Sequence, residues 1–149
     1  MKYIFILIML FLLTVIFQIF TGIWIFYEKY SFSTDLIQKK ILGDPENFIN
    51  PASLEGLLET TVPHIVSLSV ISFVIFHLFY FTKISCLKIY LFSAVFLTGI
   101  VNSICSILIL KISPLFSYLK IFSFILFEIC LVLSVLLLFY DIYVRSNKV

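Results

Sequence analysis

Residues 3–27 read YIFILIMLFLLTVIFQIFTGIWIFY, an uninterrupted run without a single charged side chain. A helix needs on the order of 20 apolar residues to cross a hydrocarbon layer roughly 30 Å thick, so this run is long enough to span a membrane. Three further apolar runs of similar length cover residues 61–81, 87–110 and 119–143. The sequence therefore predicts an all-α membrane protein with four transmembrane helices.

The composition of the whole chain agrees with this prediction. Its 149 residues are 62% hydrophobic and 12% charged, whereas soluble domains are roughly half apolar and a quarter charged. Short links at 82–86 and 111–117 join the last three spans, and short links make neighbouring helices antiparallel. We expect one membrane domain over residues 1–149, folded as an up-down four-helix bundle.

The only long connection is the loop between the first two spans, residues 28–60. It carries six of the eight acidic residues, together with Pro45 and Pro51. Ser33 can cap a short amphipathic helix that ends at Leu42, before Gly43. This helix is too short to cross a membrane, so we expect it to lie on the membrane surface. A second helix is expected to start near Ser53 and lead into the second span.

Several polar residues fall inside the predicted spans, where polar side chains are costly and mark functional-site hypotheses. Counted inward from the loop side, Gln18, Asn102 and Glu128 lie at nearly the same depth, and Ser69 or Ser72 adds a fourth polar group. One interpretation is a structural network in which Glu128 hydrogen-bonds to Asn102 and Gln18. The other makes Glu128 a titratable proton or cation site.

Both histidines, His64 and His77, lie on the second span, which raises the possibility of haem b binding. Thirteen residues separate them along the helix by roughly 20 Å, but leave the two rings roughly 140° apart around its axis. Bis-histidine ligation would also need a second chain. Alternatively, His64 lies at the loop-side interface with Glu59. No span has the closely spaced ligands of a metal site.

Other kinds of chemistry find little support in the sequence. The net charge is +2 and the longest basic run is Lys39-Lys40, so the basic surface that nucleic-acid binding requires is missing. The three cysteines lie in or beside apolar segments without a C-x-x-C pair, as expected of apolar packing residues. They are Cys86, Cys105 and Cys130.

The orientation in the membrane follows from the basic residues outside the hydrocarbon. Five Lys or Arg side chains fall on the side of the termini and five on the side of the loop. The first group lies in shorter tails and turns, which favours both termini in the cytoplasm. Abundant Ile, Phe, Leu and Lys fit an AT-rich bacterial genome, and thus a bacterial inner membrane.

Four functions are compatible with these features. The favoured one is a non-catalytic accessory, assembly or sensory module that acts through the 28–60 loop on another membrane protein or a second copy of itself within the bilayer. The first alternative is a small oligomeric proton-coupled transporter using Glu128, and the second is a homodimeric b-type haem electron-transfer protein. A lipid-modifying enzyme is the least supported, and its candidate residues are Glu55, Glu59, Thr60 and His64.

Overall fold

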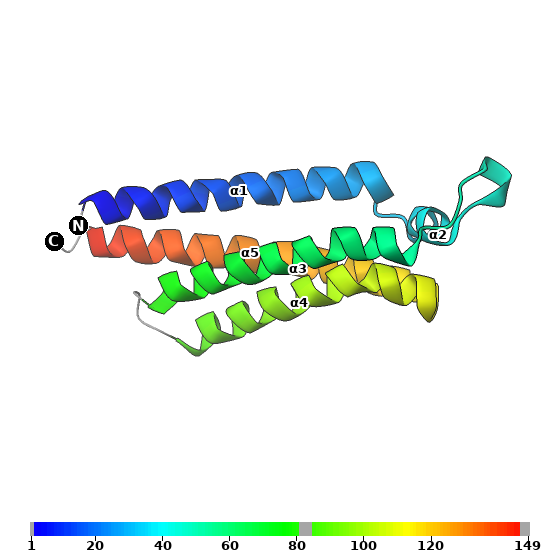
Figure 1. Ribbon diagram of the computed structural model, residues 1–149. Helices are drawn as coiled ribbons and strands as arrows, with labels where there is room; N and C mark the ends of the chain where they lie inside the picture. Colours follow the sequence, from blue (N-terminus) through cyan, green and yellow to red (C-terminus); the bar gives the residue numbers. More distant parts are fainter. Residues whose placement is uncertain (1, 81–84, 147–149) are drawn as a thin grey trace.

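The structure is a computed structural model that describes residues 2–80 and 85–146, with side-chain environments between residues 6 and 144. It contains five α-helices and one short 3-10 helix, and the described residues form no strand. The elements follow in the order α1 (Lys2–Tyr30), α2 (Thr34–Leu42), η1 (Pro45–Asn47), α3 (Leu54–Tyr80), α4 (Cys86–Lys111) and α5 (Phe116–Ser146). Figure 1 shows the four long helices side by side, with both termini at one end and α2 at the other.

The four long helices confirm the predicted fold class, because each is long and apolar enough to cross a membrane. α3 begins at Leu54, as expected of the helix that starts near Ser53, and it continues without a break into the second span. Ser53 caps it, with its side-chain oxygen accepting a hydrogen bond from the Gly56 N–H at 3.1 Å, and the helix continues through Pro63. Of the predicted link at 82–86, residues 82–84 lie outside the described residues.

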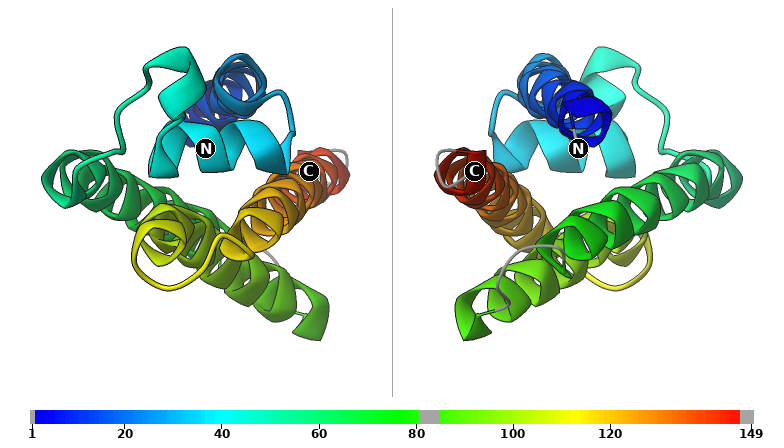
Figure 2. Two further views of the ribbon diagram at one scale, coloured as in Figure 1. Left: turned by 90° about the vertical axis from the view of Figure 1, so that its right-hand side faces the viewer. Right: turned by 90° about the vertical axis from the view of Figure 1, so that its left-hand side faces the viewer.

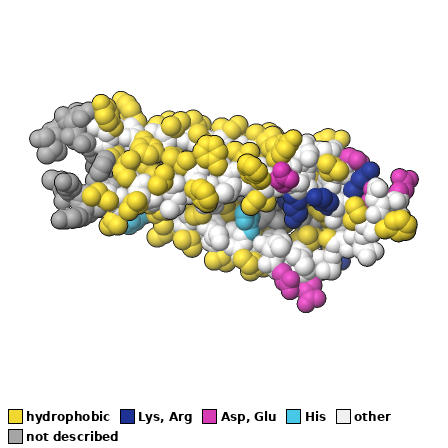
Figure 3. All heavy atoms as spheres, turned by 90° about the horizontal axis from the view of Figure 1, so that it is seen from above, with side chains coloured by type: hydrophobic (Ala, Val, Ile, Leu, Met, Phe, Trp, Pro, Cys, Tyr) yellow, Lys and Arg dark blue, Asp and Glu magenta, His cyan; other side chains and the backbone are white. Residues whose placement is uncertain are grey.

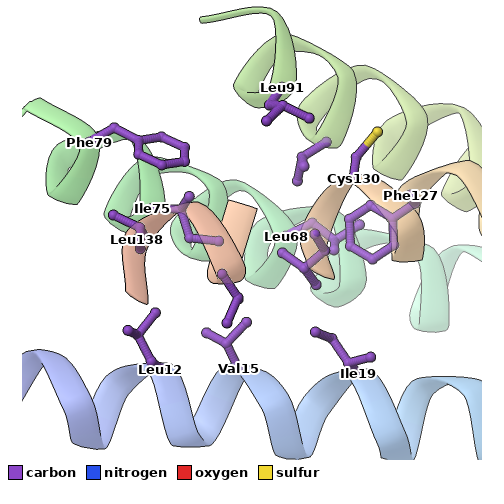
Figure 4. Close-up of a cluster of buried hydrophobic side chains, with 13 residues drawn as sticks. Leu12, Val15, Ile19, Leu68, Ile75, Phe79, Leu91, Phe127, Cys130 and Leu138 are labelled. Carbon is purple, nitrogen blue, oxygen red and sulfur yellow. The ribbon is translucent and has the colours of Figure 1, made fainter. Parts of the chain in front are cut away.

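The helices do not contact one another equally. α5 packs along α4, α4 packs along α3, and the backbone of α1 comes close to those of α5 and α2 but not to those of α3 or α4 in the described part of the chain. Figure 4 shows the main apolar core, where side chains of α1 meet those of α3, α4 and α5. Leu12, Val15 and Ile19 of α1 recur at three- and four-residue spacing, which places them on one helix face. The rest of α1 is left largely exposed.

The short helix α2 corrects one prediction from the sequence. Its expected cap at Ser33 and its end at Gly43 are present, but its apolar face does not point outward. Ile37 and Ile41 are buried, and α2 lies across the loop-side end of the bundle, in contact with α1, α4 and α5 (Figure 2). Its apolar face is covered by protein because the ends of the long helices offer an apolar cluster there.

Two polar contacts of Gln38 fasten α2 to the bundle. Its side-chain nitrogen donates a hydrogen bond to the Ser117 hydroxyl at 2.9 Å and another to the Pro114 carbonyl at 3.3 Å. Both acceptors belong to the connection between α4 and α5 or to the first turn of α5. The 28–60 segment is therefore attached to the bundle at this point.

An ion pair connects α4 and α5 near the opposite end. Lys88 is buried and its ammonium group contacts the Asp141 carboxylate, while the same ammonium lies 5.7 Å from the centre of the Phe79 ring. Lys88 is one of the five basic residues that the sequence places on the side of the termini. The structure turns it toward the neighbouring helix, because a partner with opposite charge is within reach on α5.

Candidate functional site

A cavity of about 510 Å³ lies in the loop-side half of the bundle, between α1 on one side and α3, α4 and α5 on the others. It lies where the backbone of α1 is close to that of α5 but not to those of α3 or α4. Its walls carry an unusual share of polar groups for the interior of a membrane-spanning bundle. These include Gln18, Thr21, Thr61, Asn102, Ser103, Ser106, Lys120 and Glu128.

The three residues of the predicted polar layer all line this cavity. Glu128 and Asn102 are both 8% exposed, yet the expected hydrogen bond between them is not formed. Among the described residues, Glu128 Oε2 and Asn102 Oδ1 have no hydrogen-bond partner. Buried polar atoms are almost always satisfied, and each exception calls for an explanation such as a bound water, an ion or a functional role. Gln18 lines the same cavity from α1.

Gly22 allows Glu128 to approach α1 closely. A Cβ atom added at Gly22 would lie 3.0 Å from Glu128 Oε1, which is tighter than an ordinary van der Waals contact. The absence of a side chain therefore makes room for the carboxylate. This pairing of a glycine on α1 with a carboxylate on α5 fixes where the deep end of the cavity meets the first helix.

Lys120 and Lys29 line the end of the cavity nearest the loop. Lys120 is 7% exposed, and its ammonium donates a hydrogen bond to the Asn102 carbonyl at 3.3 Å. The two ammonium groups lie over the same Tyr30 ring, at 5.7 Å for Lys120 and 5.3 Å for Lys29. In the described part of the chain, neither lysine forms an ion pair with a carboxylate.

The remaining predicted residues are not brought together. His64 lines the cavity, whereas Glu59 does not. His77 is exposed and stacks on Phe73 with a ring distance of 6.1 Å, and the two histidines do not converge on one haem-sized site. Ser69 and Ser72 do not line the cavity either, and α3 contributes Thr60, Thr61, His64 and Leu68 instead. Within the described residues, no three potential metal ligands gather.

Beyond α2, residues 44–49 form a compact turn. The Asp44 carboxylate accepts hydrogen bonds from the Glu46 N–H at 3.1 Å and the Asn47 side chain at 2.8 Å, and Lys39 lies 3.5 Å away. The hydrogen bond from Asn47, followed by the charge on Lys39, lowers the pKa of Asp44, so Asp44 is charged at neutral pH. Gly43 enters the turn at φ 91°, where a Cβ would meet the Ile49 carbonyl at 2.9 Å.

This turn presents one large apolar side chain to the surroundings. Phe48 is 94% exposed and adopts a left-handed backbone conformation at φ 55°, which is uncommon for a bulky residue. The Asp44–Ile49 backbone pair holds the turn through two hydrogen bonds of 2.9 Å. Phe48 is thus held in a defined, outward-facing position at the end of the molecule away from the termini.

The cavity and the 28–60 segment share side chains. Phe26, Tyr30 and Phe124 line the cavity, and the same three residues form a buried cluster with Ile37 and Ile41 of α2. Phe26 stacks on Phe124 with ring centres 3.9 Å apart. A change inside the cavity therefore acts directly on the residues that hold α2.

Two of the site residues were missed by sequence reasoning. Lys120 and Tyr30 are not among the residues that the sequence singles out, yet both are 7% exposed and form part of the cavity wall. The spacing of Lys120, Phe124 and Glu128 was a usable signal, because residues four apart share one helix face. A lysine on the face of a buried glutamate is expected to point inward with it.

Comparison with known proteins identifies a family for this chain. A family model described as a transmembrane helical domain matches residues 31–149, which is more than half of the chain. The match begins just after α1, so the 28–60 segment and the last three spans carry most of the family pattern. No curated protein and no solved structure matches the chain. The chain therefore belongs to the Aq_1264_TM family of transmembrane helical domains.

Proposed function

We propose that this small membrane protein is a non-catalytic sensory module in which the polar cavity receives a ligand and the 28–60 segment passes the signal to a partner. The cavity supplies buried polar atoms that the fold itself leaves unpaired, Glu128 Oε2 and Asn102 Oδ1. Leaving such atoms unpaired costs about 1–3 kcal/mol each, which a bound ligand can offset.

The shared cluster is the observation that carries this proposal. Phe26, Tyr30 and Phe124 face the cavity on one side and contact the buried face of α2 on the other. A ligand that displaces any of these rings must also change the packing of Ile37 or Ile41, because interiors are packed too tightly to absorb such a shift. Occupancy of the cavity is therefore expected to change the position or stability of the 28–60 segment.

The exposed turn supports the output half of the proposal. Phe48 lies at the tip of the 28–60 segment, on a turn held by the Asp44 side chain, and exposed aromatic residues are enriched at protein interfaces. The proposed partner is another membrane protein or a second copy of this chain. With the termini in the cytoplasm of a bacterium, the turn would face the opposite side of the inner membrane.

Site-specific photo-crosslinking in cells tests this output. A photoreactive amino acid at position 48 is expected to form a discrete adduct, whereas the same group at Tyr118, an exposed aromatic residue near the same end of α5, is not. Adding Gly22→Leu, which fills the cavity beside Glu128, is expected to change the yield of the adduct. No adduct specific to position 48, or a yield indifferent to Gly22→Leu, would count against a sensory role.

A proton-coupled carrier is a second candidate, favoured by one observation. Glu128 is buried at the deep end of a cavity that spans four helices, which is where a proton-carrying carboxylate would be needed. In proteoliposomes with a pH gradient, a carrier is expected to move protons or a co-substrate, and Glu128→Gln is expected to abolish that flux while the protein stays folded. Absence of flux in the wild-type protein would remove this candidate.

A further inference from the structure

Three basic side chains gather at the loop-side end of the cavity. Lys29, His64 and Lys120 all line it, and the two lysines flank the ring of Tyr30 at 5.3 Å and 5.7 Å. In Figure 3, dark-blue basic side chains lie at this end of the molecule together with several magenta acidic ones, and one cyan histidine lies nearby. Of the described residues, Glu128 is the only carboxylate on the cavity wall, and it lies about 12 Å further along α5 than Lys120.

Of these three residues, Lys120 is the one whose burial is not explained by its contacts within the fold. A buried ammonium is costly unless it is paired. Lys120 is buried, with only 7% of its surface exposed. Its described contacts are one neutral carbonyl, at 3.3 Å, and one aromatic ring. Neither neutralises its charge. An anion held near Lys120 and Lys29 would supply the missing countercharge to Lys120, and Lys29, which is exposed, would add a second charged donor.

The other walls of the cavity indicate what is attached to that anion. Deeper in the cavity, apolar side chains from three helices alternate with the polar ones, including Ile25, Leu68, Phe127 and Leu131. α1 and α3 both line this space, and their backbones do not approach each other closely, so an alkyl chain can lie between the two helices at this level. Bilayer lipids offer such chains at this depth.

We propose that the cavity binds an amphiphile with an anionic phosphate or carboxylate headgroup, which lies between Lys29, Lys120 and His64 while its apolar chain lies between α1 and α3. This proposal rests on the proposed receiving role of the cavity and names its ligand class. The geometry that carries it is the convergence of two lysines on one tyrosine ring in a cavity whose deeper walls are largely apolar.

Binding to the full-length protein in a mild, uncharged detergent tests the proposal, with native mass spectrometry as the readout. Three probes separate the headgroup from the chain: dilauroyl phosphatidate, dilauroylglycerol and inorganic phosphate. We expect saturable one-to-one binding of the phosphatidate, with the neutral diacylglycerol at least about tenfold weaker because it lacks the charge-assisted hydrogen bonds. Inorganic phosphate is expected to bind weakly, because it lacks the chain.

Charge-removing variants locate the site. Lys120→Met is expected to weaken phosphatidate binding at least about tenfold, and Lys29→Met to weaken it in the same direction. Lys111→Met is the matched control, because Lys111 is an exposed lysine at the same end of the bundle but is not on the cavity wall. If Lys120→Met does not fold, the comparison of Lys29→Met with Lys111→Met decides.

Two results would overturn the proposal. Equal loss of binding in Lys111→Met and in the cavity variants would mean that a general surface charge attracts the lipid. Inorganic phosphate that binds as tightly as phosphatidate would exclude the amphiphile as the ligand. Either result leaves the crosslink at position 48 and its dependence on Gly22→Leu unaffected, so this proposal and the sensory role can fail separately.

Discussion

Ile37→Ala is expected to release α2 from the bundle while the four long helices stay folded. Ile37 is fully buried among Phe26, Tyr30 and Phe124, and truncating a buried isoleucine to alanine costs about 2–5 kcal/mol. Because α2 is short and attached at few points, the lost free energy is expected to favour local opening of α2 rather than global unfolding. The open population then rises by a factor of about thirty or more.

Tryptic cleavage measures that opening, because Lys39 and Lys40 lie within α2 and become cleavable only when the helix opens. The cleavage rate after these lysines is expected to follow the open population when reclosing is fast. Leu36→Ala is the matched control, since Leu36 is a neighbouring apolar residue of α2 that is 38% exposed. Equal cleavage rates in the two variants would show that the buried face of α2 does not hold it in place.

The fold was largely predictable from the sequence, and the reason is physical. Runs such as 3–27 and 87–110 have the length and apolarity that only a membrane-spanning helix can satisfy. The caps of α2 were equally readable, because Ser33 and Gly43 act through their local backbone geometry. Local and compositional features of this kind do not depend on which helices are neighbours.

The faces through which the helices contact one another, in contrast, could not be predicted. Both lipid-facing and helix-facing sides of these spans are apolar, so hydrophobicity does not separate them. The burial of Ile37, and of Lys88 beside Asp141, depends on partners that come from distant parts of the sequence. The sequence predicts a shared depth for Gln18, Asn102 and Glu128 but not the cavity that all three line.

A ligand bound in the cavity is expected to reduce the open population of α2 by up to about a hundredfold. If the opening of α2 removes Phe26, Tyr30 and Phe124 from the cavity wall, the open state does not bind the ligand. Ligand at a free concentration of a hundred times its dissociation constant then stabilises the closed state by about 2.7 kcal/mol. The effect is large because Phe26, Tyr30 and Phe124 both line the cavity and belong to the cluster that covers α2.

Amide hydrogen exchange of residues 34–49, with and without dilauroyl phosphatidate, tests the central claim that the cavity and the 28–60 segment act as one unit. We expect slower exchange in this segment when the wild-type protein is saturated with dilauroyl phosphatidate. In Lys120→Met, we expect little change at the same lipid concentration. Saturated binding to the wild-type protein with unchanged exchange in residues 34–49 would contradict this claim.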